Sequence, residues 1–324
     1  IRVSTDYKDF ITRNVQPAKC LRYMAFHYSI GIWVVVSVLV CGCVAEVKID
    51  GDSEAVKPEP PEEVPVTLSL TINFAADDAS GAGFGNGDAV GLFVVARDDV
   101  SGASVNVYEN VRAVLENGRW KTAEEMWLTK QTAGVDVYCY SPYSDNAAAG
   151  VLETSVSTEQ NTDDGYGASV LLWGKKAGVE PSEKPVSVAM SNLMSCLNVV
   201  VKAGNGWTAE EMTEAVVHYC GLATKAKVRL ETGRVAADGG VEEIAARNNG
   251  DGTYSAIVVP QAVSDLELVR IRIGSDEYLL KTSIDLLPGK KHTCEITVSK
   301  TNGNFSATIG GWETDDNDYG GPVD

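Results

Sequence analysis

Residues 66–74, VTLSLTINF, alternate strictly between apolar and polar side chains. The polar positions hold Thr, Ser and Asn, and the apolar positions are Val66, Leu68, Leu70, Ile72 and Phe74. Successive side chains of a β-strand point to opposite faces of its sheet. The pattern therefore predicts a strand with one buried face and one solvated face.

Segments of similar character follow along nearly the whole chain. They are short, rich in Val, Ile, Leu and Tyr, and separated by clusters of Gly, Asn, Asp and Pro that are typical of turns. We expect further strands at residues 88–99, 103–111, 119–128, 134–144, 167–174, 184–191, 196–204, 215–223, 226–235, 252–261, 266–274, 277–286, 292–300 and 304–312. This arrangement predicts an all-β protein built as a sandwich or a barrel.

One short helix is expected among these strands. Thr208 and Glu211 form a capping-box pattern, in which the hydroxyl and the carboxylate each satisfy a backbone amide at the start of a helix. The same pentapeptide, TAEEM, also occupies residues 122–126, between Trp120 and Trp127. There the aromatic flanks and the short length favour a strand, because strand propensity depends strongly on context.

The N-terminal region carries an export pattern. Residues 30–40 are apolar except for Gly31 and Ser37, and these eleven residues are too few for a membrane-spanning helix, which needs about 20. Their length matches the apolar core of a signal peptide. The run ends at Cys41-Gly42-Cys43, which resembles a bacterial lipobox with Cys43 as the residue that receives the lipid.

These features divide the chain into a leader, a tether and a folded part. Residues 1–42 are predicted to be a leader, with a translation start at Met24 or earlier, and residues 43–64 an acidic, proline-rich tether. The alternative is that the apolar run is a short buried strand with incidental cysteines. The remaining residues match the length of one large domain or two ordinary domains.

The chain is strongly acidic, with a net charge of −18. Residues 1–42 hold five Lys and Arg against two Asp and Glu, so the part from Cys43 onward carries −18 − 3 = −21. Such a charge repels nucleic acid and anionic membrane surfaces, and it suits a soluble body exposed outside the cell. Nucleic acid is therefore not an expected partner.

Four cysteines remain beyond the predicted leader and lipidation site: Cys139, Cys196, Cys220 and Cys294. Cys139 and Cys294 continue the period-two apolar pattern of their predicted strands, which is typical of small buried thiols. We predict free buried cysteines. A disulfide remains the alternative, because four cysteines allow three pairings.

No segment carries a complete catalytic, cofactor-binding or metal-binding pattern. The glycine-rich residues 81–88 (GAGFGNGD) lack the third glycine and the Lys-Ser/Thr of phosphate-binding loops, so we expect a turn. Residues 315–320 (DDNDYG) place Tyr319 at a ligand position of a calcium loop, so we expect a solvated acidic tail. His218 and His292 each lie on a predicted strand without a second ligand cluster. We predict a non-enzymatic protein with no cofactor.

Eight motifs occur in a fixed order between residues 66 and 312. They are GDAVGLFV (87–94), NGRW followed by MWL, VDVYCYSPYS (135–144), LLWGKK, VSVAMSNLMSCLNVVV, GLATKAKVRLETGRV, IVVPQ (257–261) and IGGW (309–312). Together they resemble the fimbrillin-like family, which comprises lipoprotein pilus subunits and related surface proteins of Gram-negative anaerobes. The resemblance covers nearly all of the predicted mature chain.

The resemblance implies two tandem transthyretin-like β-sandwiches, which we place at residues 65–190 and 191–324. It also implies export as a lipoprotein to the outer membrane, and a surface-exposed role in fimbriae or adhesion. In pili of this kind a protease removes the N-terminal strand after a basic residue, and a strand of another subunit fills the groove. The expected partners are therefore other fimbrillin-like subunits, bound by β-strand addition, and the lipid anchor is expected to hold the chain in the outer membrane.

The sequence departs from this pattern after its first predicted strand. Residues 75–87 contain no Lys or Arg, the first arginine after Cys43 is Arg97, and 12 residues follow Trp312. We therefore expect an anchor, tip or accessory subunit rather than a self-polymerising stalk subunit. The alternative is a free-standing surface lipoprotein that binds a host protein or glycan through exposed aromatics such as Trp207 or Tyr319.

Overall fold

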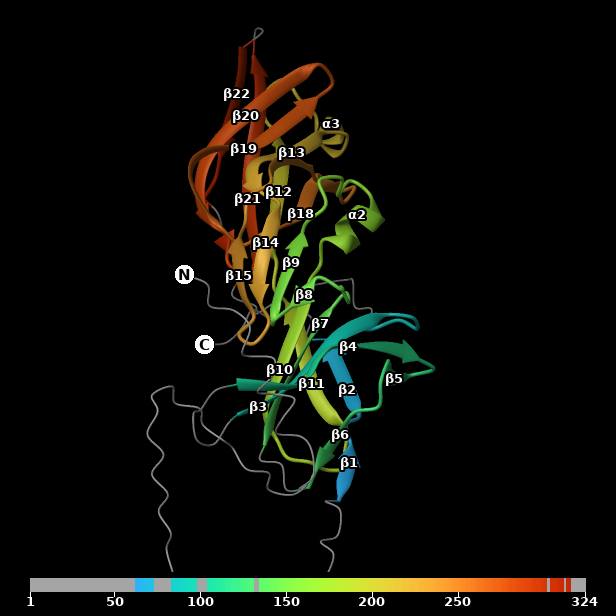
Figure 1. Ribbon diagram of the computed structural model, residues 1–324. Coiled ribbons are helices and arrows are strands. Elements are labelled where there is room, and N and C mark those ends of the chain that lie inside the picture. Colours follow the sequence, from blue (N-terminus) through green and yellow to red (C-terminus); the bar gives the residue numbers. More distant parts are fainter. Residues whose placement is uncertain are drawn as a thin grey trace, which may run out of the picture. The chain divides into compact units, whose positions relative to one another are not determined.

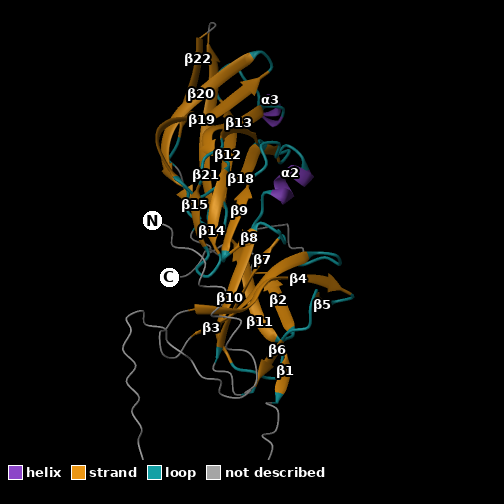
Figure 2. Ribbon diagram, viewed as in Figure 1, coloured by secondary structure: helices purple, strands orange, loops and turns teal. Residues whose placement is uncertain are grey.

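The computed structural model describes residues 62–72, 83–97, 104–130, 134–301, 304–311 and 313–315. Strands dominate these residues and their two helices are short (Figure 1, Figure 2), so the all-β prediction is confirmed. No helix in this part of the chain is long and apolar enough to cross a bilayer. The predicted leader and most of the predicted tether lie outside the described residues.

The earlier strands form a mixed seven-stranded sheet. Its order is β2 (Leu68–Ile72), β11 (Val186–Asn192), β10 (Leu172–Val179), β7 (Val135–Ser141), β3 (Ala89–Arg97), β4 (Ser104–Glu116) and β5 (Arg119–Thr122). β2 runs parallel to β11, and the other neighbours are antiparallel. A separate antiparallel pair joins β1 (Glu63–Pro65) to β6 (Trp127–Thr129).

Both faces of the seven-stranded sheet are covered in its middle. In β3, Leu92 belongs to a smaller hydrophobic cluster, whereas its neighbour Phe93 belongs to a larger one. β7 divides in the same way, with Cys139 in the smaller cluster and Tyr140 in the larger. A strand buried on both faces needs apolar residues at successive positions, which explains the nearly continuous apolar run of β7.

Two sheets enclose most of the larger cluster. One has the order β17 (Arg247–Asn248), β18 (Thr253–Val258), β12 (Ser195–Ala203), β21 (Lys291–Thr301) and β22 (Asn304–Ile309), and β23 (Glu313–Thr314) also pairs with β21. The other has the order β16 (Val241–Ala245), β13 (Val216–Ala223), β19 (Ala262–Ile273) and β20 (Asp276–Asp285). Their inward side chains form a sandwich core.

A further four-stranded sheet connects segments from either side of residue 190. Its order is β15 (Arg234–Ala237), β14 (Lys225–Arg229), β9 (Val151–Ser155) and β8 (Ala147–Ala148). The fully buried Gln160 makes a second link, because its side-chain amide donates to the carbonyl of Ile257 (2.7 Å) and accepts from the same residue's N–H (2.8 Å). The division into domains at 65–190 and 191–324 therefore stays a prediction.

The predicted helix is confirmed as α3 (Ala209–Thr213), and its capping box is complete. The N–H of Glu211 donates to the Thr208 hydroxyl (3.3 Å), and the N–H of Thr208 donates to the Glu211 carboxylate (2.8 Å). A second helix, α2 (Asp163–Ala168), was not predicted. Thr162 caps it by accepting from the N–H of Gly165 (3.1 Å), so the strand predicted from residue 167 begins only at Leu172.

The strand predicted at residues 119–128 is also corrected. β5 ends at Thr122 and β6 begins at Trp127, with the residues between them in neither a strand nor a helix. The N–H of Ala123 still donates to the carbonyl of Arg112 on β4 (2.7 Å). The chain then leaves β4 to pair with β1, and this change of partner divides the predicted strand in two.

Tyr140, near the end of β7, connects three neighbouring segments through its side chain. Its fully buried ring lies over Gly91, where an added Cβ would come within 2.2 Å of the Tyr140 Cε1 atom. Its hydroxyl lies 2.7 Å from the carbonyl oxygen of Ser144 and 2.8 Å from the side-chain oxygen of Asn110. The Asn110 amide in turn donates to the same Ser144 carbonyl (3.0 Å). This arrangement fixes the turn after β7 and explains the adjacent glycine in β3.

Candidate functional site

The predicted lipidation residue, Cys43, lies outside the described residues, so its modification stays a prediction. The described chain begins at Glu62, where the predicted tether joins the first strand. The Lys130 ammonium lies 2.5 Å from the Glu62 carboxylate, and the Lys130 N–H donates to the Glu62 carbonyl (2.8 Å). These contacts fasten the end of the tether to the segment that follows β6.

β2 is an edge strand. It pairs with β11 through five residues, and no described strand pairs with its other side. Its apolar row faces inward as predicted: Val66 and Leu68 are buried, and Leu70 packs against the same smaller cluster. The side chain of Ile72 and all of Phe74 lie outside the description. The edge position makes this strand the geometric candidate for exchange with a strand of another subunit.

The strand predicted at residues 66–74 is interrupted at its start. The N–H of Val66 donates to the carbonyl of Met126, next to β6, whereas the carbonyl of Thr67 accepts from the N–H of Val186 in β11 (both 2.8 Å). The backbone thus changes partner between these two residues. As a result, the predicted strand begins only at Leu68, and Val66 and Thr67 belong to no strand. β1 forms at Glu63–Pro65, so the last two residues of the predicted tether, Glu63 and the buried Val64, are part of a strand instead.

Little space remains beneath β1 and the residue that follows it. A cavity lined by Val64, Val66, Leu128 and Val186 has a volume of about 10 Å³. That volume is close to the minimum that one water molecule needs. The side chains of Val64 and Val66 therefore leave little free space beneath this segment.

The segment between β2 and β3 holds no basic residue. Of residues 75–87, positions 83–87 are described, and the N–H of Gly85 donates to the Asp88 carboxylate (2.7 Å) in the turn that precedes β3. The turn predicted for the glycine-rich residues 81–88 is confirmed over its described part. Because Lys and Arg are absent from residues 75–87, cleavage after a basic residue has no substrate there.

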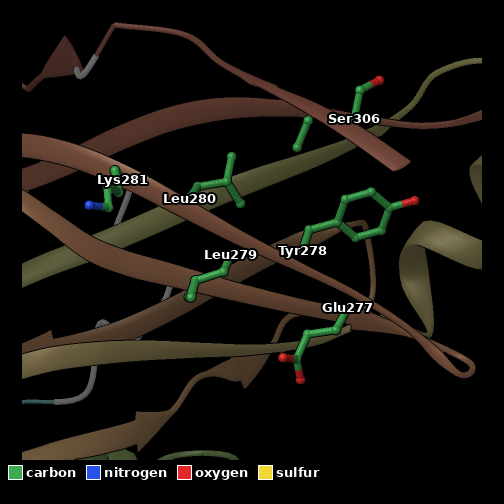
Figure 3. Close-up of a pocket in the computed structure, with 7 residues that line it drawn as sticks. Glu277, Tyr278, Leu279, Leu280, Lys281 and Ser306 are labelled. Atoms are coloured by element: carbon green, nitrogen blue, oxygen red, sulfur yellow. The ribbon is translucent and has the colours of Figure 1, made fainter. Parts of the chain in front are cut away.

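Two further strands lie at sheet edges. β20 ends one sheet of the sandwich described above, and β22 ends the other. A groove of about 340 Å³ separates them, lined by residues 277–281 of β20 and by Ser306 and Ala307 of β22 (Figure 3). Leu279 is 44% exposed at this place. The sequence did not indicate the groove, because an alternating pattern predicts a strand without showing whether it ends a sheet.

Trp207 is part of the packing around this region. Its indole N–H donates to the Tyr278 hydroxyl (2.7 Å), and the Lys300 ammonium lies 5.0 Å from the ring centroid. The ring is partly buried against the larger cluster. These contacts give Trp207 a structural role, and its ring is only partly exposed. Tyr319, the other aromatic considered for this role, lies outside the described residues.

The four cysteines beyond the tether are free thiols, as predicted, but Cys196 and Cys220 are partly exposed rather than buried. Cys139 and Cys294 are buried, and burial raises the pKa of Cys139 to about 12 and that of Cys294 to about 11. Both thiols therefore stay protonated at neutral pH, and a protonated thiol is a poor nucleophile. Their position and chemistry are those of core residues.

The two histidines on predicted strands differ in environment. His292 is fully buried in β21, and burial lowers its pKa below the ordinary value. The N–H of Leu287 donates to its Nε2 (3.0 Å), so the proton of the neutral ring lies on Nδ1, which donates to the Thr314 hydroxyl (2.9 Å). His218 lies 3.6 Å from the Glu243 carboxylate on a partly exposed sheet face. Within the described ranges, no three His, Cys, Asp or Glu side chains gather as a metal site.

The comparisons with known proteins agree with this geometry. A model of the fimbrillin-like family matches residues 76–312, which is more than half of the chain. The chain therefore belongs to the fimbrillin-like family, and the resemblance found in its motifs is confirmed. It is a fimbrial-type protein of the cell surface.

Solved structures show the same fold. A candidate cell adhesion protein from Bacteroides ovatus is similar with a TM-score of 0.58 and 19% identity, over 78% of this chain and 98% of that one. A candidate cell adhesion protein from Bacteroides uniformis has a TM-score of 0.58 and 20% identity, over 78% and 97%. None of the curated proteins matches the chain in sequence.

Proposed function

We propose that the chain is a fimbrial anchor, tip or accessory subunit that a lipid on Cys43 holds in the outer membrane. The observation that carries this proposal is the seating of the first strands. Val64, Val66 and Leu68 are buried, and only a small cavity of about 10 Å³ remains beside Val64 and Val66. The loop after β2 lacks the basic residue that strand removal requires. A subunit that keeps its first strand closes its own groove and cannot extend a stalk by strand exchange there.

In this role the chain acts without catalysis. It joins other fimbrillin-like subunits by β-strand addition at sheet edges that remain open, and it contributes to adhesion from the cell surface. Backbone hydrogen bonds supply affinity in such contacts, and the side chains beside the edge supply specificity.

The alternative is a free-standing surface lipoprotein that binds a glycan or protein. One observation favours it: Trp127 is 42% exposed, and its backbone is held by the Tyr108 hydroxyl, which accepts from the Trp127 N–H (2.8 Å). An exposed indole on a backbone held in this way is a suitable stacking surface. The seating of the first strands and the family membership favour the fimbrial role.

The lipid anchor is tested by mass spectrometry of the membrane fraction. We expect the mature chain to begin at an acylated Cys43, because Gly42 offers the small residue that lipoprotein processing needs before the cysteine. Cys43→Ala should release the chain from the membrane, whereas the matched variant Cys41→Ala should leave acylation unchanged. An intact peptide spanning residues 40–44 in the mature protein would contradict the proposed anchor.

A further inference from the structure

The outer edge of β20 is available for strand pairing. β20 ends the four-stranded sheet, and β19 is its one strand partner among the described residues. Proteins commonly block an open edge with proline, and none of the ten residues of β20 is a proline. A groove of about 340 Å³ between β20 and β22 borders residues 277–281 (Figure 3).

The hairpin geometry gives the direction of the backbone groups at this edge. A two-residue turn, Gly274 and Ser275, closes the hairpin on the pair Ile273 and Asp276. In a two-residue hairpin the closing pair is hydrogen-bonded, and hydrogen-bonded pairs alternate with non-hydrogen-bonded pairs from there. The backbone N–H and C=O groups of residues 277 and 279 therefore point away from β19, toward the open edge. The extra residue at the next step, Leu268, lies on β19, and burial along β20 alternates regularly through Lys281, so residue 281 keeps the same orientation.

The side chains of the same three residues share the outward face of the sheet. Burial alternates along β20, with Tyr278 and Leu280 inside and Leu279 exposed. Figure 3 shows Glu277 and Leu279 on the side of the strand opposite to Tyr278 and Leu280. The outward row is thus Glu277, Leu279 and Lys281, an apolar residue between one negative and one positive charge.

This row is complementary to itself when one strand is reversed. We propose that β20 pairs antiparallel with β20 of a second copy of this chain, with Leu279 opposite Leu279 on the two-fold axis. Glu277 then lies opposite Lys281 of the second copy, and Lys281 lies opposite its Glu277. Opposite charges placed directly across an antiparallel pair stabilise it, and such an isologous contact closes after two copies.

The pairing also continues a charge pattern that each copy already has. Arg272 of β19 lies 3.0 Å from Glu277, and Glu267 of β19 lies 3.9 Å from Lys281. Across the proposed contact each row reads Arg272, Glu277, then Lys281 and Glu267 of the second copy. Signs alternate along the whole row, which an arbitrary partner strand would not provide.

Electrostatics favour a second copy at this edge in spite of the chain's net charge of −18. The five residues 277–281 have no net charge, so the contact itself carries no repulsion between like charges. The contact area of a single strand pair is small, so we expect a weak dimer in solution. Anchoring both copies in one membrane would raise their effective concentration.

A disulfide trap tests the register. Residues opposite each other in a hydrogen-bonded antiparallel pair have Cα atoms about 5.5 Å apart, within the range that a disulfide spans. The full chain carrying Leu279→Cys should form a covalent dimer on mild oxidation. Val241→Cys is the matched control, because Val241 is 66% exposed on β16 at the opposite edge of the same sheet. Leu279→Cys yielding no more covalent dimer than Val241→Cys or the unchanged chain would overturn the proposal.

Charge exchange tests the chemistry by sedimentation of the full chain. Glu277→Lys places a lysine at residue 277 of each copy opposite Lys281 of the other copy. Like charges then face each other at both positions, so we expect the dimer to be lost. The double variant Glu277→Lys/Lys281→Glu restores opposite charges across the axis and should restore the dimer. An unchanged chain that sediments as a monomer at every concentration, or a dimer insensitive to Glu277→Lys, would contradict the contact. The disulfide trap decides the matter if circular dichroism shows that Glu277→Lys does not fold.

Discussion

Removal of residues 62–72 is expected to open the seven-stranded sheet. This change exposes the smaller cluster, because Val64, Val66 and Leu68 are buried in it. Full burial of one such side chain contributes about 1.5–3 kcal/mol, so the three together contribute on the order of 5–9 kcal/mol. A domain's net stability is about 5–15 kcal/mol, so the loss is comparable with the whole. Urea unfolding followed by circular dichroism should show that the truncated chain unfolds at a much lower denaturant concentration than the full chain.

Two single substitutions in β2 compare a buried residue with an exposed residue of the same strand. Leu68→Ala should lower the free energy of unfolding by about 2–5 kcal/mol, because it removes buried methyl groups and leaves a cavity. The matched control is Ser69→Ala, one residue along on the exposed side of β2, which should stay within about 0.5 kcal/mol. Equal effects of the two substitutions would contradict the one-sided burial of this strand.

Truncation of Tyr140 is expected to have the second-largest effect. Tyr140→Ala removes a fully buried ring from the larger cluster and should cost about 3–5 kcal/mol. Tyr140→Phe keeps the ring over Gly91 and loses only the hydroxyl beside Asn110 and Ser144. It should cost about 1–3 kcal/mol, because polar groups around the hydroxyl lose a partner. Chemical denaturation of both variants measures the difference, and an alanine variant as stable as the phenylalanine variant would show that the ring is not central.

Period-two alternation predicted most of the strands because it records which side of a strand is buried. It failed where the tertiary partner decides the conformation. The pentapeptide TAEEM forms a capped helix at residues 208–212 but none at 122–126. At the second place Thr122 completes the ladder with β4, and Trp127 begins the pair with β1. Local propensity was the same at both places, so the pairing partners made the difference.

β16 was missed for a related reason. Its sequence, VEEIA, places three exposed residues before two buried ones, so it has no alternation to detect. Pairing with β13 holds it as a strand. The two glutamic acids also conceal it from composition, because charged residues are uncommon in strands.

The candidate assembly edges, β2 and β20, could be identified only from the structure. Alternation identified the apolar row of β2, and the sequence alone showed that the following loop lacks Lys and Arg. Neither observation could show that β2 and β20 end their sheets, because sheet order depends on pairings between residues far apart in the chain. The complementarity of residues 277–281 was likewise present in the sequence, but it has meaning only on an open edge.

The N-terminus of the chain taken from cells tests the proposed anchor, tip or accessory role most directly. We expect sequencing and native gels to show material that retains residues 62–74 and runs without a ladder of higher assemblies, because β2 stays seated on β11. Material that begins after Phe74 and runs as a ladder would show that the first strand is removed and exchanged. The chain would then be a stalk subunit.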